Sequence, residues 1–183
     1  TFDGSGLTIT GDLLVNADNQ SIRNLVVAGN VTISSSIKES VDFNAVDVRG
    51  KVSIVESAET ARLQRTASLA MPVAETVTTR VKIKFADSSV AFMEIKRTDI
   101  ELGLYGNTRV TTISTEANTS IITNPQVILP KLTISKGVTY VELNASIASI
   151  EVDSNDDIKI SGNGNFNSVF VKTDKTVTLN LTA

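Results

Sequence analysis

The chain has 183 residues, a length that suits one ordinary domain with a substantial core. It contains neither Cys nor His, which excludes disulfide bonds, thiol nucleophiles, imidazole bases and zinc sites of the Cys/His type. The formal charge is −3, acidic and basic residues are interleaved and Trp is absent, so the basic runs and aromatic platforms of nucleic-acid-binding proteins are missing. We therefore expect no nucleic-acid partner and no cofactor.

No stretch approaches the roughly 20 apolar residues of a membrane span, so we expect no direct insertion into a membrane. The chain starts Thr1-Phe2-Asp3-Gly4, which is neither an initiator Met nor a signal peptide. We therefore expect an excised or processed piece of a larger protein, with any targeting or anchoring segment outside it.

The first third of the chain repeats an apolar pattern centred on glycine. Residues 7–15 (Leu-Thr-Ile-Thr-Gly-Asp-Leu-Leu-Val) recur as residues 25–33 and 46–54, and the glycines Gly11, Gly29 and Gly50 are spaced by 18 and then 21 positions. Alternation places the apolar side chains on one face of each short strand, and glycine permits a bend that a Cβ would resist. Each unit is therefore predicted to be strand, corner, strand. A meander of hairpins is the alternative, since x-Gly also marks two-residue turns.

The middle of the chain is less regular. Between residues 56 and 79, Leu63, Ala67, Ala70 and Met71 have helical spacing and Pro72 stops the run, which indicates either a short helix or a surface loop beside the strands. Six further runs are predicted strands: Val81–Phe85, Val90–Ile95, Ile100–Tyr105, Val110–Ile113, Ser120–Thr123 and Val127–Leu129. Between Glu56 and about Pro130 we expect the repeat either to be interrupted or to be misread from the sequence.

The C-terminal third contains two interleaved series of apolar pairs. One series runs Leu132/Ile134, Ile150/Val152 and Val169/Val171, and the other runs Val141/Leu143, Ile158/Ile160 and Val177/Leu179. Two faces that repeat with the same period are typical of stacked coils hydrogen-bonded about 4.8 Å apart.

These patterns predict an all-β fold, a parallel β-helix (β-solenoid) with coils of about 18 to 20 residues, formed by residues 1–183 as a single domain. Right-handed coiling is expected, as for most parallel β connections. The open ends of such a stack expose unpaired strand edges, which predicts self-association through the solenoid ends.

The period also predicts which outward side chains stack. Glu142, Lys159 and Thr178 should lie on successive coils of one face, and Thr133, Glu151 and Phe170 on another. A Glu142 to Lys159 contact would be a surface ion pair of about 0 to 1 kcal/mol. The two faces are interpreted either as ordinary solvated surfaces or as a shallow groove for a polymeric ligand, with Glu142, Lys159, Glu151 and Phe170 as the candidate contact residues.

The sequence gives less support to catalysis, metal binding or ice binding. The acids that could serve a polysaccharide-cleaving enzyme are Asp42, Asp47, Asp87, Glu94, Asp99 and Glu101, but they form no recognisable catalytic signature, and we expect no catalytic residues. The segment 153–157 clusters oxygen atoms that could hold Ca²⁺ but lacks the EF-hand spacing, so a plain turn is favoured and no metal site is expected. Thr8 belongs to a Thr-x-Thr element of the kind that ice-binding solenoids repeat on every coil. The equivalent positions of the next two repeats are Val26 and Asp47, so the threonine does not recur and ice binding is disfavoured.

The opening 7–15, its return at 29–33 and the later Lys131-Leu-Thr-Ile-Ser-Lys-Gly-Val138 resemble β-solenoid segments of bacterial cell-surface proteins that carry S-layer-homology anchoring modules. The resemblance implies an extracellular, wall-associated protein in which this region is a non-catalytic stalk, spacer or adhesive element. Its expected partners are cell-wall or extracellular polysaccharide, or other surface proteins. The alternative is a β-helix protein that binds or degrades polysaccharide.

Overall fold

The computed structural model describes residues 1–56 and 80–182, and within them every regular element is a β-strand. Val, Ile and Thr favour strands because β-branched side chains pack well on a pleated surface. The strands are β1 (Phe2–Ile9), β2 (Leu13–Val15), β3 (Gln20–Val27), β4 (Val31–Ile33), β5 (Ser40–Ile54), β6 (Val81–Ala86), β7 (Ser89–Ile95), β8 (Ile100–Tyr105), β9 (Arg109–Thr115), β10 (Thr119–Thr123), β11 (Ile128–Ile134), β12 (Tyr140–Asn144), β13 (Ser146–Val152), β14 (Ile158–Gly162), β15 (Asn165–Val171) and β16 (Val177–Leu181). The predicted helix or loop of the middle segment lies, from residue 57 to 79, outside the described residues.

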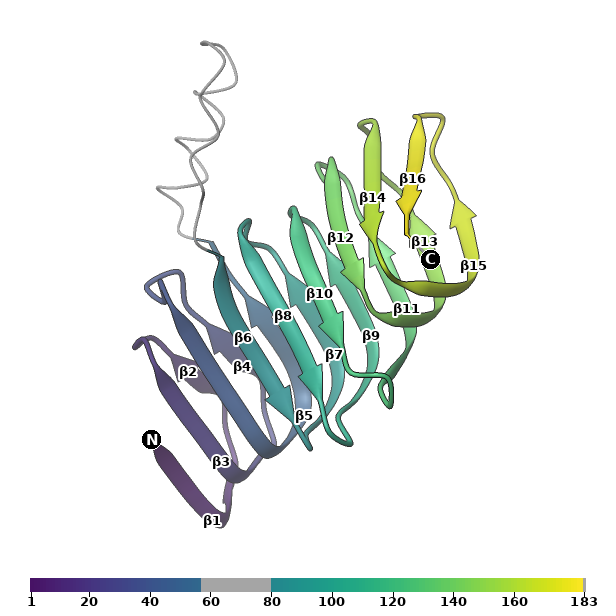
Figure 1. Ribbon diagram of the computed structural model, residues 1–183. Coiled ribbons are helices and arrows are strands. Elements are labelled where there is room, and N and C mark those ends of the chain that lie inside the picture. The colour runs from purple at the N-terminus through teal and green to yellow at the C-terminus, as the bar shows by residue number, and fades with distance from the viewer. Residues whose placement is uncertain (57–79, 183) are drawn as a thin grey trace.

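The strands pair in parallel and stack into a solenoid of about 8 turns, which confirms the predicted fold (Figure 1). From β6 onward the even-numbered strands stack on one side and the odd-numbered strands on the other. The long strand β5 belongs to both stacks, because its first part pairs with β6 and its second part with β7. Residues in register on neighbouring coils are 18 positions apart at Lys131 and Ser149 and 22 apart at Thr119 and Val141, so coil length varies slightly more than expected.

Each coil presents three outer faces. The first face comprises β6, β8, β10, β12, β14 and β16 with the opening residues of β1, β3 and β5. The second face comprises the opening residues of the odd-numbered strands from β7 onward and the residues of β1, β3 and β5 in register with them. The third face comprises the closing residues of the same odd-numbered strands together with β2, β4 and the end of β5. In β7 the consecutive outward residues Ala91 and Phe92 break the alternation and mark the bend between the second and third faces.

The interior is one continuous column of apolar side chains, most of them aliphatic. Strands β7, β9 and β11 share the same pattern of buried positions, so each coil buries the same faces as its neighbours. In the first C-terminal series, Leu132 is in register with Ile150 and Ile150 with Val169, as the spacing predicted. Full burial of one such side chain is worth about 1.5 to 3 kcal/mol, and the column therefore carries most of the stabilising energy.

The predicted glycine corners are present, but the structure gives them a different physical basis. The amide of Gly29 donates to the carbonyl of Gly11 at 3.2 Å, and the amide of Gly50 donates to that of Gly29 at 3.1 Å. A Cβ on Gly50 would lie 2.4 Å from the Gly29 carbonyl oxygen, whereas a Cβ on Gly11 would meet nothing within 4 Å. Glycine is therefore required at the second and third corners by the close approach of the preceding coil, and not by the bend itself.

The expected interruption before Pro130 is wrong for the described residues from 80 onward, where β6 to β11 continue the stack without a break. All six predicted strands of this region are present, and the last of them joins the following apolar pair in β11. The repeat was hard to see in the sequence because these coils have no glycine at the bend between the second and third faces. Their bend is made by two consecutive outward residues, such as Ala91 and Phe92.

Asn and Asp side chains connect the turns of successive coils. The Asp12 carboxylate accepts the Asn30 amide at 2.7 Å, and the Asn30 side chain accepts the Lys51 amide at 3.0 Å. Asn118 accepts the amides of Thr139 and Tyr140 in the same way. These bonds satisfy backbone N–H groups that have no strand partner, which keeps the turns in register with the sheets.

Candidate functional site

One predicted outward column is present on the third face. Thr133 is in register with Glu151, and Glu151 with Phe170, as the spacing indicated. The column continues toward the N-terminus through Ser114 and Glu94. Phe170 is 57% exposed on the last complete coil, so its ring is an apolar contact surface at the end of a polar column.

The other predicted column needs a correction. Lys159 and Thr178 are in register, but the partner of Lys159 on the preceding coil is Tyr140, and Glu142 lies opposite Ser161. The predicted Glu142 to Lys159 ion pair is therefore wrong. Glu142 instead accepts a hydrogen bond from Arg80 Nη1 at 2.6 Å.

Two carboxylates of the third face are each held between two lysines. Glu94 lies 3.0 Å from Lys51 Nζ and 3.3 Å from Lys96 Nζ. Burial alone would raise the pKa of Glu94, but the hydrogen bonds and charges of Lys51 and Lys96 outweigh it, and the pKa is lowered. This arrangement keeps the carboxylate ionised, and Lys96 also lies 3.9 Å from the Glu116 carboxylate, so the charges of the cluster balance.

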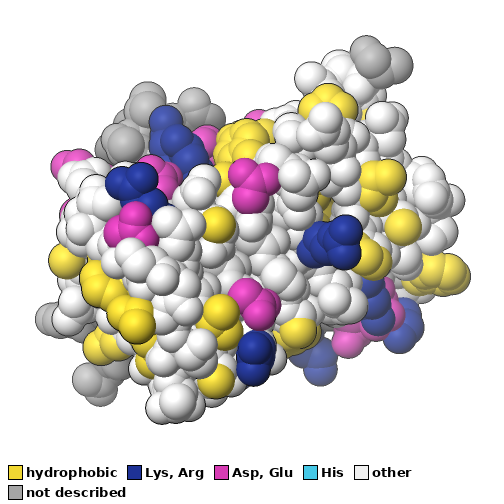
Figure 2. Space-filling model, turned by 90° about the horizontal axis from the view of Figure 1, so that it is seen from below, with side chains coloured by type: hydrophobic (Ala, Val, Ile, Leu, Met, Phe, Trp, Pro, Cys, Tyr) yellow, Lys and Arg dark blue, Asp and Glu magenta, His cyan; other side chains and the backbone are white. Residues whose placement is uncertain are grey.

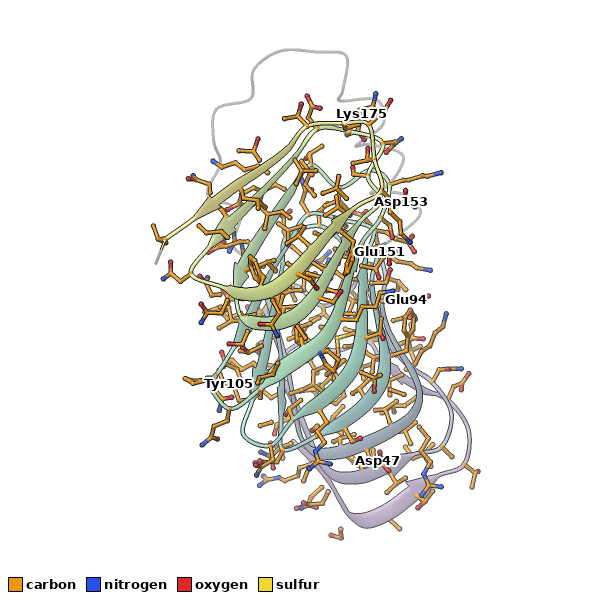
Figure 3. All side chains as sticks on the ribbon, turned by 90° about the vertical axis from the view of Figure 1, so that its right-hand side faces the viewer. Asp47, Glu94, Tyr105, Glu151, Asp153 and Lys175 are labelled. Carbon is orange, nitrogen blue, oxygen red and sulfur yellow. The ribbon has the colours of Figure 1, made fainter. Side chains whose placement is uncertain are left out.

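The second cluster repeats the arrangement closer to the C-terminus. Glu151 lies 3.1 Å from Lys131 Nζ and 2.8 Å from Lys172 Nζ. Hydrogen bonds from Lys172 and Lys131 lower the pKa of Glu151. Glu94 and Glu151 lie on the same side of the molecule, whereas Tyr105 lies on the opposite side (Figure 3). A carboxylate already paired on both sides is poorly suited to general acid or base catalysis, so both clusters are best explained as links between coils.

A hollow of about 580 Å³ lies on the first face, where β3, β5, β6 and β8 run side by side. The charged residues that line it are Arg23, Asp42 and Lys84, and Tyr105 closes one side. Asp42 and Lys84 are in register on neighbouring strands, yet they form no ion pair within the described part of the chain. The hollow therefore brings two cations, one carboxylate and an aromatic ring to the same shallow surface.

The remaining candidate acids are scattered over the coil. Asp47 lies on the second face near Arg49, Asp87 accepts the Asn107 amide in a turn, and Glu101 is in register with Lys82. Among residues 1–56 and 80–182 no group of three or more acidic side chains is placed to hold a metal ion. In the segment 153–157, Asn155 and Asp157 accept backbone amides of neighbouring coils.

Surface charge is interspersed over the face shown in Figure 2. Acidic and basic side chains are mixed there with polar and hydrophobic ones, and no region of one sign dominates. In the part of the chain that the structure describes, no helix is long and apolar enough to cross a membrane.

Comparison with known proteins adds no further identification. No family model, curated protein or solved structure matches the chain.

The sequence alone did not point to the hollow. Asp42 was a candidate acid, but Arg23, Lys84 and Tyr105 had no role in any predicted site. Between Asp42 and Lys84 the chain contains residues 57–79, whose length conceals that the two residues are in register. The signal that could have found them is the match of 40–44 with 82–86, in which polar and apolar residues alternate in both segments.

Proposed function

We propose that this chain is a non-catalytic, rigid element of a bacterial cell-surface, S-layer-associated protein, located outside the cell, whose outer faces bind polysaccharide. The observation that carries the proposal is the unbroken parallel stack of about 8 turns around a single apolar column. Such a stack contacts only neighbouring coils and extends in one direction, which suits a stalk that holds a binding surface away from a wall.

Stiffness follows from the number of independent links between coils. Backbone ladders join every pair of neighbouring coils, side chains such as Asn30 and Asn118 join the turns, and the ion pairs of Glu94 and Glu151 join coils of the third face. Bending the rod would stretch all three kinds of bond on its convex side. A polymeric ligand that lies along such a surface contacts several coils at once, and many weak contacts then add to a useful affinity.

The resemblance of the opening repeat to β-solenoid segments with S-layer-homology modules supports the location. Polysaccharide is favoured over other partners because the hollow of the first face combines an aromatic ring with charged and amide groups, a common arrangement for recognising polar rings. Degradation of polysaccharide is the alternative, and it differs from binding in one measurable property, turnover.

The test uses the purified chain on a panel of insoluble cell-wall and plant polysaccharides. We expect retention on at least one matrix, with no release of reducing ends or unsaturated products. Retention with product release would replace the binding role by a catalytic one. Absence of both from the whole panel would contradict polysaccharide binding and leave a spacer role.

Self-association through the ends is a second part of the proposal. Both end coils expose large apolar side chains: Phe2, Leu7 and Leu14 at one end, and Phe170, Val171, Leu179 and Leu181 at the other. A second copy placed end to end would cover these side chains and pair the free strand edges. Sedimentation over a range of concentrations should then show association that Leu179→Lys weakens, whereas a monomer at all concentrations would exclude it.

A further inference from the structure

The hollow on the first face lies over a position where one coil has only a small side chain. Arg23, Asn44, Ala86 and Tyr105 occupy equivalent positions on successive coils, and Ala86 supplies only a methyl group between two larger neighbours. The Tyr105 ring does not cover Ala86. It is turned over Gly103, where a Cβ would lie 2.5 Å from the Tyr105 Cε2 atom, so it bounds the hollow as a wall.

The charged groups around this hollow are incompletely paired. Asp42 Oδ1 is buried and has no hydrogen-bond partner, and Lys84 is exposed and forms no ion pair among the described residues. Arg23 has one acidic neighbour, Asp3, at 3.7 Å, and both side chains are about half exposed. Oppositely charged residues in register on adjacent strands normally attract each other. Asp42 and Lys84 form no ion pair with each other although both line the hollow, and a ligand with both acceptor and donor groups would pair with both.

The groups present restrict the chemistry of that ligand. Lys84 and Arg23 favour an anion, and the guanidinium of Arg23 can pair with a planar carboxylate through two hydrogen bonds. Asp42 and Asn44 supply acceptors for hydroxyl groups, and the Tyr105 ring supplies an apolar wall for the C–H surface of a sugar ring. A phosphate polymer fits less well, because the Asp42 carboxylate would repel a ligand with no hydroxyl donor in reach. The volume is in the range of small-molecule sites.

We propose that this hollow binds a carboxylated sugar unit of an acidic polysaccharide, with Lys84 and Arg23 on the carboxylate and Asp42 and Asn44 on the hydroxyl groups. This inference rests on the proposed polysaccharide-binding function and assigns it a position on the first face. The clusters of Glu94 and Glu151 on the third face have no part in it.

The experiment measures binding of a hyaluronan hexasaccharide and of its carboxyl-reduced form to the whole chain by titration calorimetry. Lys84→Met is compared with Lys82→Met, a matched control because Lys82 is also an exposed outward residue of β6 but does not line the hollow. We expect Lys84→Met to weaken binding of the acidic sugar about tenfold, as for loss of one charge-assisted hydrogen bond, and Lys82→Met to change it less than twofold. Higher salt should weaken binding of the acidic sugar and leave binding of the carboxyl-reduced sugar unchanged.

The outcomes separate this inference from the function on which it rests. If the acidic sugar binds but the two lysine variants weaken its binding equally, the hollow is not the binding site, although polysaccharide binding is retained. Equal affinity for the acidic and carboxyl-reduced sugars would overturn the requirement for a carboxylate. If neither this pair of sugars nor the wider panel of matrices binds the unsubstituted chain, the binding function itself fails.

Discussion

Phe43 and Phe85 stack in the core with ring centroids 4.5 Å apart and ring planes 6° from parallel. Both rings are almost fully buried, and the two residues are in register on β5 and β6 although residues 57–79 come between them in the chain. The contact therefore shows that the coil repeat is the same on both sides of that segment.

We expect Phe43→Ala and Phe85→Ala each to lower the free energy of unfolding by about 3 to 5 kcal/mol, because each leaves a cavity in a close-packed column. The double variant should cost less than the sum, by about 0.5 to 1.5 kcal/mol, since both changes remove the same ring contact. Denaturant unfolding gives these values. Phe92→Ala, which removes a partly exposed outward ring of β7, is the control and should cost clearly less. Strict additivity of the two core variants would argue that the rings are not in contact.

The glycine corners give a prediction with a built-in control. Gly29→Ala and Gly50→Ala should each destabilise the protein by about 1 to 3 kcal/mol, because the added Cβ would meet the backbone of the preceding coil. Gly11→Ala should change stability by less than about 0.5 kcal/mol, since open space surrounds the corresponding position. Thermal unfolding of the three variants is sufficient. A similar cost at Gly11 would show instead that the bend itself requires glycine.

The two lysine-flanked carboxylates predict how stability depends on pH. The pKa of Glu94 and of Glu151 is lowered in the folded protein, whereas in the unfolded chain it returns to about 4.3. Their contribution is therefore fully present above that unfolded value and is lost as the pH falls through the lower folded value.

Urea unfolding between pH 3 and pH 6 measures this loss. In the Glu94→Gln variant the free energy of unfolding should fall less steeply below pH 5, because Gln does not titrate. Glu101→Gln, on a carboxylate that forms no ion pair among the described residues, should leave the slope as it was. An unchanged slope for Glu94→Gln would show that its lysines do not stabilise the ionised form.

The corrected register predicts which residues Glu142 interacts with. A double-mutant cycle should find a coupling energy near 1 kcal/mol between Arg80 and Glu142, the upper part of the range for partly exposed ion pairs. The same cycle between Glu142 and Lys159 should give a value indistinguishable from zero, because the two are not in register. Measurable coupling of Glu142 to Lys159 would restore the register inferred from sequence spacing.

The two C-terminal series show how far spacing alone can define a register. The column of Thr133, Glu151 and Phe170 was predicted correctly, because the coils that carry it return at 18 and 19 positions and their apolar pairs match in only one way. The column through Glu142 was predicted two residues out of register. A slip by two residues keeps every side chain on its own face of a strand, so apolar alternation cannot detect it.

By itself the sequence determined the parallel solenoid, the approximate coil length and the inward or outward direction of most strand residues. It could do so because period-two alternation and a constant return distance are local properties of the chain. The tertiary structure alone decided which outward residues meet: Arg80 with Glu142, and Asp42, Lys84 and Tyr105 around one hollow. These neighbours depend on the lengths of the turns and of residues 57–79, which vary without changing the pattern that strands require.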